Sequence, residues 1–326
     1  MKFFFQLLLL LLFSNAFAQH TKQKEPFAHT FSIVARDEKT GELAVGVQSH
    51  WFGVGTVVSW AEAGVGAVAT QSFVNVSFGT RGLQLLKAGL TPQQAVDSLL
   101  SDDNGREVRQ LAIIDTNGNT ATYTGKNCIQ FADHKNGQHF SVQANMMLND
   151  KVIPAMEKAW NINAGKELPE RVVEVLKAAQ LAGGDIRGKQ SASLLVVKPR
   201  SSGKIWEDRY IDLRVDDHPN PIVELSRLLK VFRAYEYMNT GDVLMENNDM
   251  AGAMQAYNNS MKLFPSNLEM QYWTAITLAN NKEVKKALSM LQKIYAKDAN
   301  WRELTKRLKP AGLLNVTEAV YQQLIK

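Results

Sequence analysis

The chain has 326 residues, of which 45% are hydrophobic and 21% are charged, as expected of a folded soluble protein with a sizeable core. Its net charge of +5 is not concentrated in runs and no nucleic-acid-binding motif is present, so no nucleic-acid partner is expected. The single cysteine, Cys128, excludes an internal disulfide, and we expect a buried, inert thiol.

The first residues have the pattern of a secretory signal peptide. Lys2 precedes an apolar run over residues 3–13, and a small-x-small cleavage site follows at residues 16–18. This run is shorter than the ~20 residues that span a bilayer, so no permanent membrane span is expected. The sequence therefore predicts a signal peptide over residues 1–18 and an exported protein, periplasmic or secreted, whose mature chain begins at Gln19.

A polar, flexible leader is predicted over residues 19–29, and a β pattern begins at Thr30. Helices are predicted at residues 78–88, after the capping box that begins at Thr91, and at residues 151–160 and 169–182. Apolar runs bounded by turn residues predict strands at residues 30–37, 43–49, 65–71, 110–114, 120–124, 140–144, 192–198 and 210–215. Strands and helix pairs thus alternate, and two face-to-face sheets covered by helices would bury every apolar face.

Beyond Pro221 the pattern is helical only, with a repeat of about 34 residues. In the first copy the aromatic, small and proline positions of the tetratricopeptide pattern are occupied by Tyr237, Gly241, Ala253, Tyr257 and Pro265. An all-α, tetratricopeptide-like domain is therefore predicted over residues 222–326. Its concave surface would bind a protein or peptide partner, although the helices would equally pack on the first domain or on each other.

Four separated phrases carry a family resemblance: TFSIVARD at residues 30–37, GVGAVATQ at 64–71, GKQSA at 188–192 and DLRVDDH at 212–218. With them the chain resembles the family called domain of unknown function 1028, which is placed in the N-terminal-nucleophile (Ntn) hydrolase superfamily. The resemblance implies an α+β fold, a four-layer αββα Ntn-hydrolase-like sandwich over residues 30–221. It assigns no substrate.

The resemblance also makes Thr30 the candidate catalytic nucleophile, because the superfamily uses a threonine, serine or cysteine exposed at the start of the first strand. A freed α-amine has a pKa near ~7.7–8.0 and can take the hydroxyl proton, whereas an amide nitrogen cannot. Many members of the family begin Met-Thr, but here export leaves eleven residues, 19–29, ahead of Thr30. A second cut, at the His29–Thr30 bond, is required.

Two serines and a histidine are the nearest supporting candidates. Ser32 shares a strand face with Thr30 by the period of two, although a core serine with a local hydrogen bond is the alternative. Ser49 and His50 end the second strand, which by resemblance lies beside the nucleophile. Gln48 stands where superfamily members often have a carboxylate, and the lysine of a later strand is not apparent.

Further supporting or substrate-binding candidates are polar residues near predicted strand ends: Gln71, Asn75, Arg81, Asn145, Asp185 and Arg187. Gln71, Asn75 and Arg81 would act as amide donors or an anion clamp. Asn145 would act as an oxyanion donor, and Asp185 and Arg187 would act together as a pair in the site. Capping and loop hydrogen bonds, or an internal ion pair, are the alternatives. No metal site and no cofactor are expected.

Two functional hypotheses remain open. The first is an exported Ntn-type amide or peptide-bond hydrolase that acts through Thr30 on a small amide or peptide-like substrate. The second is a non-catalytic periplasmic binding or adaptor protein, in which the sandwich holds such a ligand and the helical repeats recruit a partner.

Overall fold

The computed structural model describes residues 26–326, which fall into two compact units with the boundary along the chain between Ile222 and Val223. The predicted signal peptide and residues 19–25 of the predicted leader lie outside the described residues.

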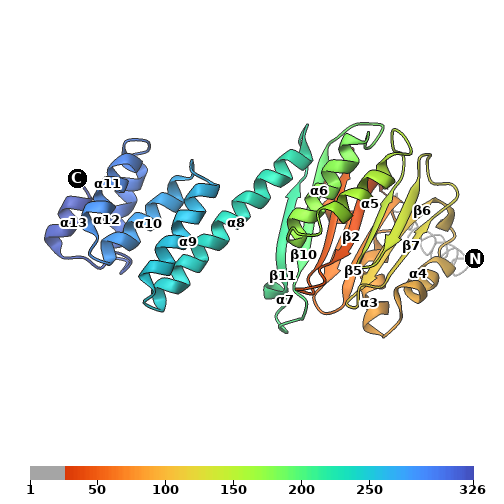
Figure 1. Ribbon diagram of the computed structural model, residues 1–326, viewed down its shortest axis with the longest axis horizontal. Coiled ribbons are helices and arrows are strands. Elements are labelled where there is room, and N and C mark those ends of the chain that lie inside the picture. The colour runs from red at the N-terminus through yellow and green to blue at the C-terminus, as the bar shows by residue number, and fades with distance from the viewer. Residues whose placement is uncertain (1–25) are drawn as a thin grey trace, which may run out of the picture. The chain divides into compact units, whose positions relative to one another are not determined.

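The first unit contains two antiparallel sheets (Figure 1). The five-stranded sheet has the order β1-β5-β6-β7, with β4 also paired to β5; its strands are β1 (Phe27–Ala28), β4 (Ser59–Glu62), β5 (Gly66–Phe73), β6 (Arg109–Asp115) and β7 (Thr120–Thr124). The six-stranded sheet has the order β11-β10-β3-β2-β9-β8, made of β2 (Thr30–Arg36), β3 (Leu43–Ser49), β8 (Asp133–Gly137), β9 (Phe140–Ala144), β10 (Ser191–Val197) and β11 (Arg209–Val215).

Helices cover the outer face of each sheet (Figure 1). The five-stranded sheet is covered by α3 (Ser77–Lys87) and α4 (Pro92–Ser101), and the six-stranded sheet by α5 (Val152–Ile162) and α6 (Leu168–Leu181). Short helical turns, α2 (Gly55–Val58), α7 (Ile205–Asp208) and a 3₁₀ turn at Arg106–Val108, complete the unit. The order is helices, sheet, sheet, helices. The prediction of a mixed α+β chain with antiparallel sheets is confirmed.

The alternation of side chains along β5 explains why the sheets face each other. Ala67 and Ala69 lie in the core between the sheets with Val45 of β3, whereas Val68 packs outward with Phe78 of α3. The period of two continues to the buried Gln71, which therefore also points between the sheets. The inner core is apolar in its middle and polar at the end where β5 reaches Gln71.

Three strands differ from the sequence prediction. Residues of the predicted flexible leader form β1, which pairs with β5 through Phe27–Phe73 and Ala28–Ser72. The polar strand β8 was not predicted, because its order comes from pairing with β9 rather than from apolar alternation. The four-residue β4 was not predicted either. The capping box at Thr91 is present and begins α4.

The second unit contains helices only, as predicted (Figure 1): α8 (Pro221–Glu246), α9 (Met250–Leu263), α10 (Leu268–Asn280), α11 (Val284–Tyr295), α12 (Asn300–Leu308) and α13 (Glu318–Leu324). Gly241 of α8 faces the buried ring of Tyr257 on α9, where a Cβ would lie 2.3 Å from Cε1. Small and aromatic residues thus meet where these helices pack. Within residues 26–326, no helix is both long enough and apolar enough to cross a bilayer.

Gly46 permits the close packing of α6 on β3 and supplies a stability test. A Cβ at this position would lie 2.3 Å from Cγ1 of the stiff, buried Val172, so Gly46→Ala should lower the free energy of unfolding by about 1–3 kcal/mol. Gly165→Ala is the matched control, because no atom lies within 4 Å of its Cβ position, and should change stability by no more than ~0.5 kcal/mol. Denaturant unfolding followed by tryptophan fluorescence measures both; equal effects would contradict the packing account.

Candidate functional site

The chain crosses from one sheet to the other just before Thr30. Ala28 belongs to β1 in the five-stranded sheet, whereas Thr30 begins β2 in the six-stranded sheet and pairs with Ser49. His29 and Thr30 are completely buried, and Thr30 Oγ1 donates to the carbonyl oxygen of Ala28 at 3.0 Å. The His29–Thr30 peptide bond therefore lies inside the protein, at the polar end of the inter-sheet core.

Two side chains donate to the carbonyl oxygen of His29. Ser49 Oγ lies 2.6 Å from it and Arg187 Nη2 lies 2.8 Å from it. The fully buried Asp185 fixes the guanidinium through Nη2–Oδ2 and Nε–Oδ1 hydrogen bonds of 2.7 and 3.0 Å. A hydroxyl and a charged donor at this range would stabilise negative charge developing on the oxygen.

The His29 imidazole is held in one tautomer. Asn145 Nδ2 donates to Gln110 Oε1 at 2.9 Å, so Asn145 turns its Oδ1 toward His29 Nδ1, 2.6 Å away. Nδ1 must then carry the proton, which leaves a lone pair on Nε2. Nε2 has no hydrogen-bond partner among residues 26–326. Burial holds the pKa of the imidazole below its ordinary value of 6.5, opposed by the hydrogen bond to Asn145, so the ring is neutral at pH 7.

A buried set of polar side chains, here called the amide network, joins the two sheets below Thr30. It consists of Ser32, Gln71, Gln110, Gln143 and Asn145, all fully buried. Ser32 Oγ donates to Gln71 Oε1 at 2.5 Å and accepts from Gln143 Nε2 at 2.6 Å, and Gln71 Nε2 donates to Gln110 Oε1 at 2.6 Å. Each broken bond would leave a buried polar group unsatisfied, at about 1–3 kcal/mol, so the network fixes the sheets against each other.

The structure brings together most of the predicted site residues: Thr30, Ser32, Ser49, Gln71, Asn145, Asp185 and Arg187. His50 contributes only its backbone N–H, which donates to Asp185 Oδ2 at 3.2 Å, and its side chain is exposed.

Two candidates belong to α3 instead of the site. Asn75 Oδ1 accepts from the backbone N–H and hydroxyl of Ser77, at 3.2 and 2.7 Å, and so serves the start of the helix. Arg81 is exposed and pairs with Asp102 at 4.0 Å. The predicted alternative of local hydrogen bonds thus accounts for Asn75, whereas Arg81 forms a surface ion pair that was not predicted.

Three site residues were missed in the sequence. Gln110 and Gln143 are single amides at inward positions of otherwise apolar strands, and that pattern was a usable signal. His29 was considered only for its peptide bond. Gln48 pairs with Phe31, so it points to the face of the sheet opposite Ser49 and cannot take the place of an acid beside Thr30.

The comparisons with known proteins can now be set beside this geometry. Residues 30–225, more than half of the chain, match the family of unknown function DUF1028. The chain belongs to this family. The crystal structure of protein SPO2555 from Silicibacter pomeroyi, described with the same family, is 31% identical, covers 62% of this chain and 85% of its own, and superposes with a TM-score of 0.57. No curated protein matches the chain.

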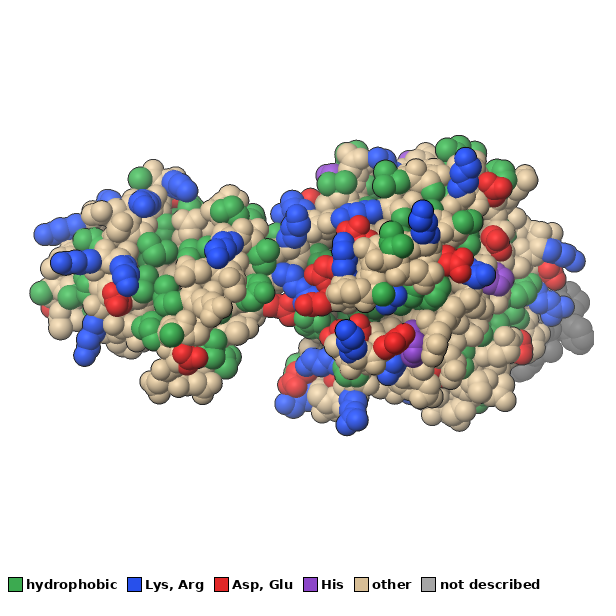
Figure 2. Space-filling view, in the orientation of Figure 1, with side chains coloured by type: hydrophobic (Ala, Val, Ile, Leu, Met, Phe, Trp, Pro, Cys, Tyr) green, Lys and Arg blue, Asp and Glu red, His purple; other side chains and the backbone are tan. Residues whose placement is uncertain are grey.

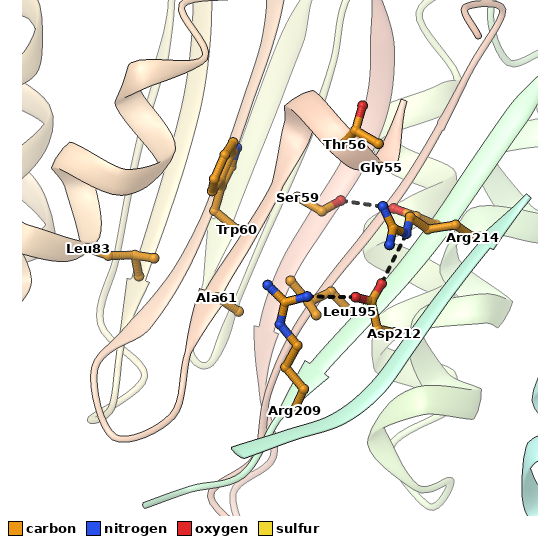
Figure 3. Close-up of a pocket in the computed structure, with 11 residues that line it drawn as sticks. Gly55, Thr56, Ser59, Trp60, Ala61, Leu83, Leu195, Arg209, Asp212 and Arg214 are labelled. Atoms are coloured by element: carbon orange, nitrogen blue, oxygen red, sulfur yellow. Dashed lines mark hydrogen bonds and ion pairs between the residues drawn. The ribbon is translucent and has the colours of Figure 1, made fainter. Parts of the chain in front are cut away.

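This DUF1028 domain also contains a cavity of about 180 Å³ between β4 and the β10–β11 pair (Figure 3). Asp212 pairs with Arg209 at 2.8 Å and with Arg214 at 3.3 Å, and Ser59 and Ser193 hydroxyls lie 3.0 Å apart. Two guanidinium groups and one carboxylate give the cavity a net charge of +1. None of the predicted site residues lines it.

The described residues contain no cluster of metal-ligating side chains. Among residues 26–326, no three histidine, cysteine, aspartate or glutamate side chains are placed to share a metal ion. Cys128 is half-buried, and burial raises the pKa of its thiol. On the face of the first unit shown in Figure 2, lysine and arginine side chains are interspersed with aspartate and glutamate.

The buried imidazole predicts a pH dependence of stability. The unfolded chain takes up a proton on His29 near pH 6.5, whereas burial lowers the pKa of this imidazole in the folded chain, which takes up the proton only at lower pH. This residue therefore makes stability fall as the pH drops below about 6.5. His29→Gln keeps a donor for Asn145 but cannot titrate, and its stability should fall less steeply than the parent's between about pH 7 and 5.5. Urea unfolding at several pH values measures the slopes. Identical slopes would show that His29 is not held neutral.

Proposed function

We propose that this protein is an exported amide or peptide-bond hydrolase of the Ntn type, whose nucleophile is Thr30 after cleavage of the His29–Thr30 bond. The observation that carries the proposal is the carbonyl of His29, which accepts hydrogen bonds from Ser49 and Arg187 directly beside the Thr30 hydroxyl. The layer order of the first unit and a family match that begins at residue 30 also support it. In this proposal the first unit is an αββα Ntn sandwich.

Cleavage of the chain would proceed through an ester. Thr30 Oγ1 attacks the carbonyl carbon of His29, and the negative charge on the oxygen is stabilised by Ser49 and Arg187. The C–N bond breaks, the nitrogen of Thr30 receives the hydroxyl proton, and His29 becomes esterified to Oγ1. One water molecule then hydrolyses the ester, leaving a carboxylate on His29 and a free amine on Thr30.

The freed amine supplies the base for turnover. With a pKa near ~7.7–8.0 it is partly unprotonated at neutral pH, so it takes the Oγ1 proton as Thr30 attacks a substrate amide and passes it to the leaving amine. Water hydrolyses the resulting ester and regenerates Thr30. The same two donors serve the substrate carbonyl, and the half-buried guanidinium of Arg187, held by the buried Asp185, supplies the positive charge.

Removal of one donor tests the proposal without disturbing the core. Ser49→Ala should slow the cut at His29–Thr30 by about 10²–10³-fold, the usual effect of losing an oxyanion donor, and Thr30→Ala should abolish it. Ser193→Ala is the matched control, because this buried serine of the same sheet bonds to Ser59 and should leave the rate unchanged. Intact mass measured over time gives the rates. Equal rates for Ser49→Ala and Ser193→Ala would contradict the assigned role.

The second candidate function is that of a non-catalytic periplasmic ligand-binding or adaptor protein. The cavity of Figure 3 favours it, because it combines a net positive charge with hydroxyl groups and lies apart from Thr30. An engineered cavity of about 150 Å³ binds benzene, so 180 Å³ admits a small amide that bears a carboxylate. The tetratricopeptide-like helices of the second unit would then bind a protein or peptide partner.

Calorimetric titration with N-acetylglycine tests this candidate. Binding to the Thr30→Ala chain should be at least about tenfold weaker after Arg214→Gln, which removes one guanidinium from the cavity. Binding that Arg214→Gln does not change, or no binding at all, would remove the cavity as the ligand site.

A further inference from the structure

The segment before Thr30 lies where an extended peptide would bind. Strand β5 pairs with β6 along one edge; along its other edge it pairs first with β4, as far as Ala69, and then with β1 at Ser72 and Phe73. The N–H of Val74 also donates to the carbonyl oxygen of Pro26 at 3.0 Å. Removal of residues 26–29 would therefore leave an unpaired strand edge next to the freed Thr30, and such edges bind peptides by adding a strand.

The residue before the cleaved bond has a side-chain site of its own. The His29 ring lies against Phe27 and Phe73, which also contact each other, with centroid separations of 4.9 and 5.5 Å in edge-to-face geometry. Its Nδ1–H is bound by Asn145 Oδ1, whose orientation is fixed by the amide network. After residues 26–29 depart, the site retains the Phe73 ring and the Asn145 acceptor, so it favours a flat, uncharged side chain that donates a hydrogen bond and disfavours a carboxylate.

The ester formed during self-cleavage connects this segment to substrate recognition. In that ester the acyl group on Oγ1 is His29, with its carbonyl oxygen on Ser49 and Arg187. The ester formed from any substrate is also attached to Thr30 Oγ1. If Ser49 and Arg187 bind its carbonyl oxygen as well, its acyl carbonyl occupies the position of the His29 carbonyl. The acyl half of a substrate must then extend into the space that residues 26–29 occupy before the cut.

We propose that residues 26–29 are a built-in occupant of the substrate site, and that the substrate is an extended peptide with histidine before the cleaved amide. This inference rests on the proposed function, because it takes Thr30 as the nucleophile. The peptide would pair with the edge of β5 at Ser72 and Phe73 and with the N–H of Val74, and it would place its histidine against Phe73 and Asn145. Until the leader departs it blocks the site, which agrees with the complete burial of Thr30.

Fluorogenic peptides test the proposal on the full chain after it has cut itself and the leader has been removed by gel filtration. The first is acetyl-Pro-Phe-Ala-His-aminomethylcoumarin, which copies residues 26–29. The second carries aspartate in place of histidine, and the third, acetyl-His-aminomethylcoumarin, lacks the strand residues. We expect kcat/KM of the first to exceed that of each of the others by about tenfold or more, since each loses at least one buried hydrogen-bonding contact.

Product inhibition gives a second readout. The free peptide Pro-Phe-Ala-His should inhibit hydrolysis of the first substrate competitively, and the aspartate peptide should inhibit at least about tenfold less. A chain that cuts itself but hydrolyses all three substrates equally, or none of them, overturns the inference and leaves Thr30 as the nucleophile of self-cleavage. A folded chain whose His29–Thr30 bond stays intact overturns both the inference and the proposed function.

Discussion

Polar side chains buried between two sheets must satisfy one another, and this requirement determines the architecture around Thr30. Ser32 and Gln143 on one sheet bond to each other, and Ser32 bonds to Gln71 on the other; the chain then crosses between the sheets at His29, which the same network holds through Asn145. An apolar core could slide, because dispersion contacts have no direction. Hydrogen bonds at this depth do have direction, so they orient the chain where it crosses between the sheets at His29.

The fixed carbonyl links the fold to the proposed chemistry. Ser49 reaches it because Ser49 pairs with Thr30 across β2 and β3, and Arg187 reaches it because Asp185 is buried and clamps the guanidinium. Neither donor is needed for the apolar core. The use of a half-buried guanidinium as a donor to a neutral backbone carbonyl is clearest when that oxygen becomes negative during reaction. The same geometry explains why residues 26–29 are folded, since the carbonyl of His29 is the group being held.

The sequence predicted those parts of the fold that local patterns specify. Apolar alternation marked the inner strands, and Thr91 with Gln94 marked the start of α4. Strands β1 and β8 were not predicted, because they form through pairing with other strands and not through a local apolar pattern. The same holds for the site. Thr30 and Ser49 were predicted because they stand at strand ends, whereas the role of His29 was missed because it depends on Asn145, 116 residues away. Asn75 also follows a strand, but its side chain bonds to Ser77, two residues further on. Local hydrogen bonds of this kind compete with contacts to a site formed by distant residues.

The central claim is that the His29–Thr30 bond is held ready to break and that its cleavage makes the enzyme. Its most direct measurement is the first residue of the mature, folded protein recovered from its native host, read by N-terminal sequencing together with intact mass. The account predicts Thr30 at the new terminus. A folded, fully matured protein that still carries His29 joined to Thr30 would contradict it.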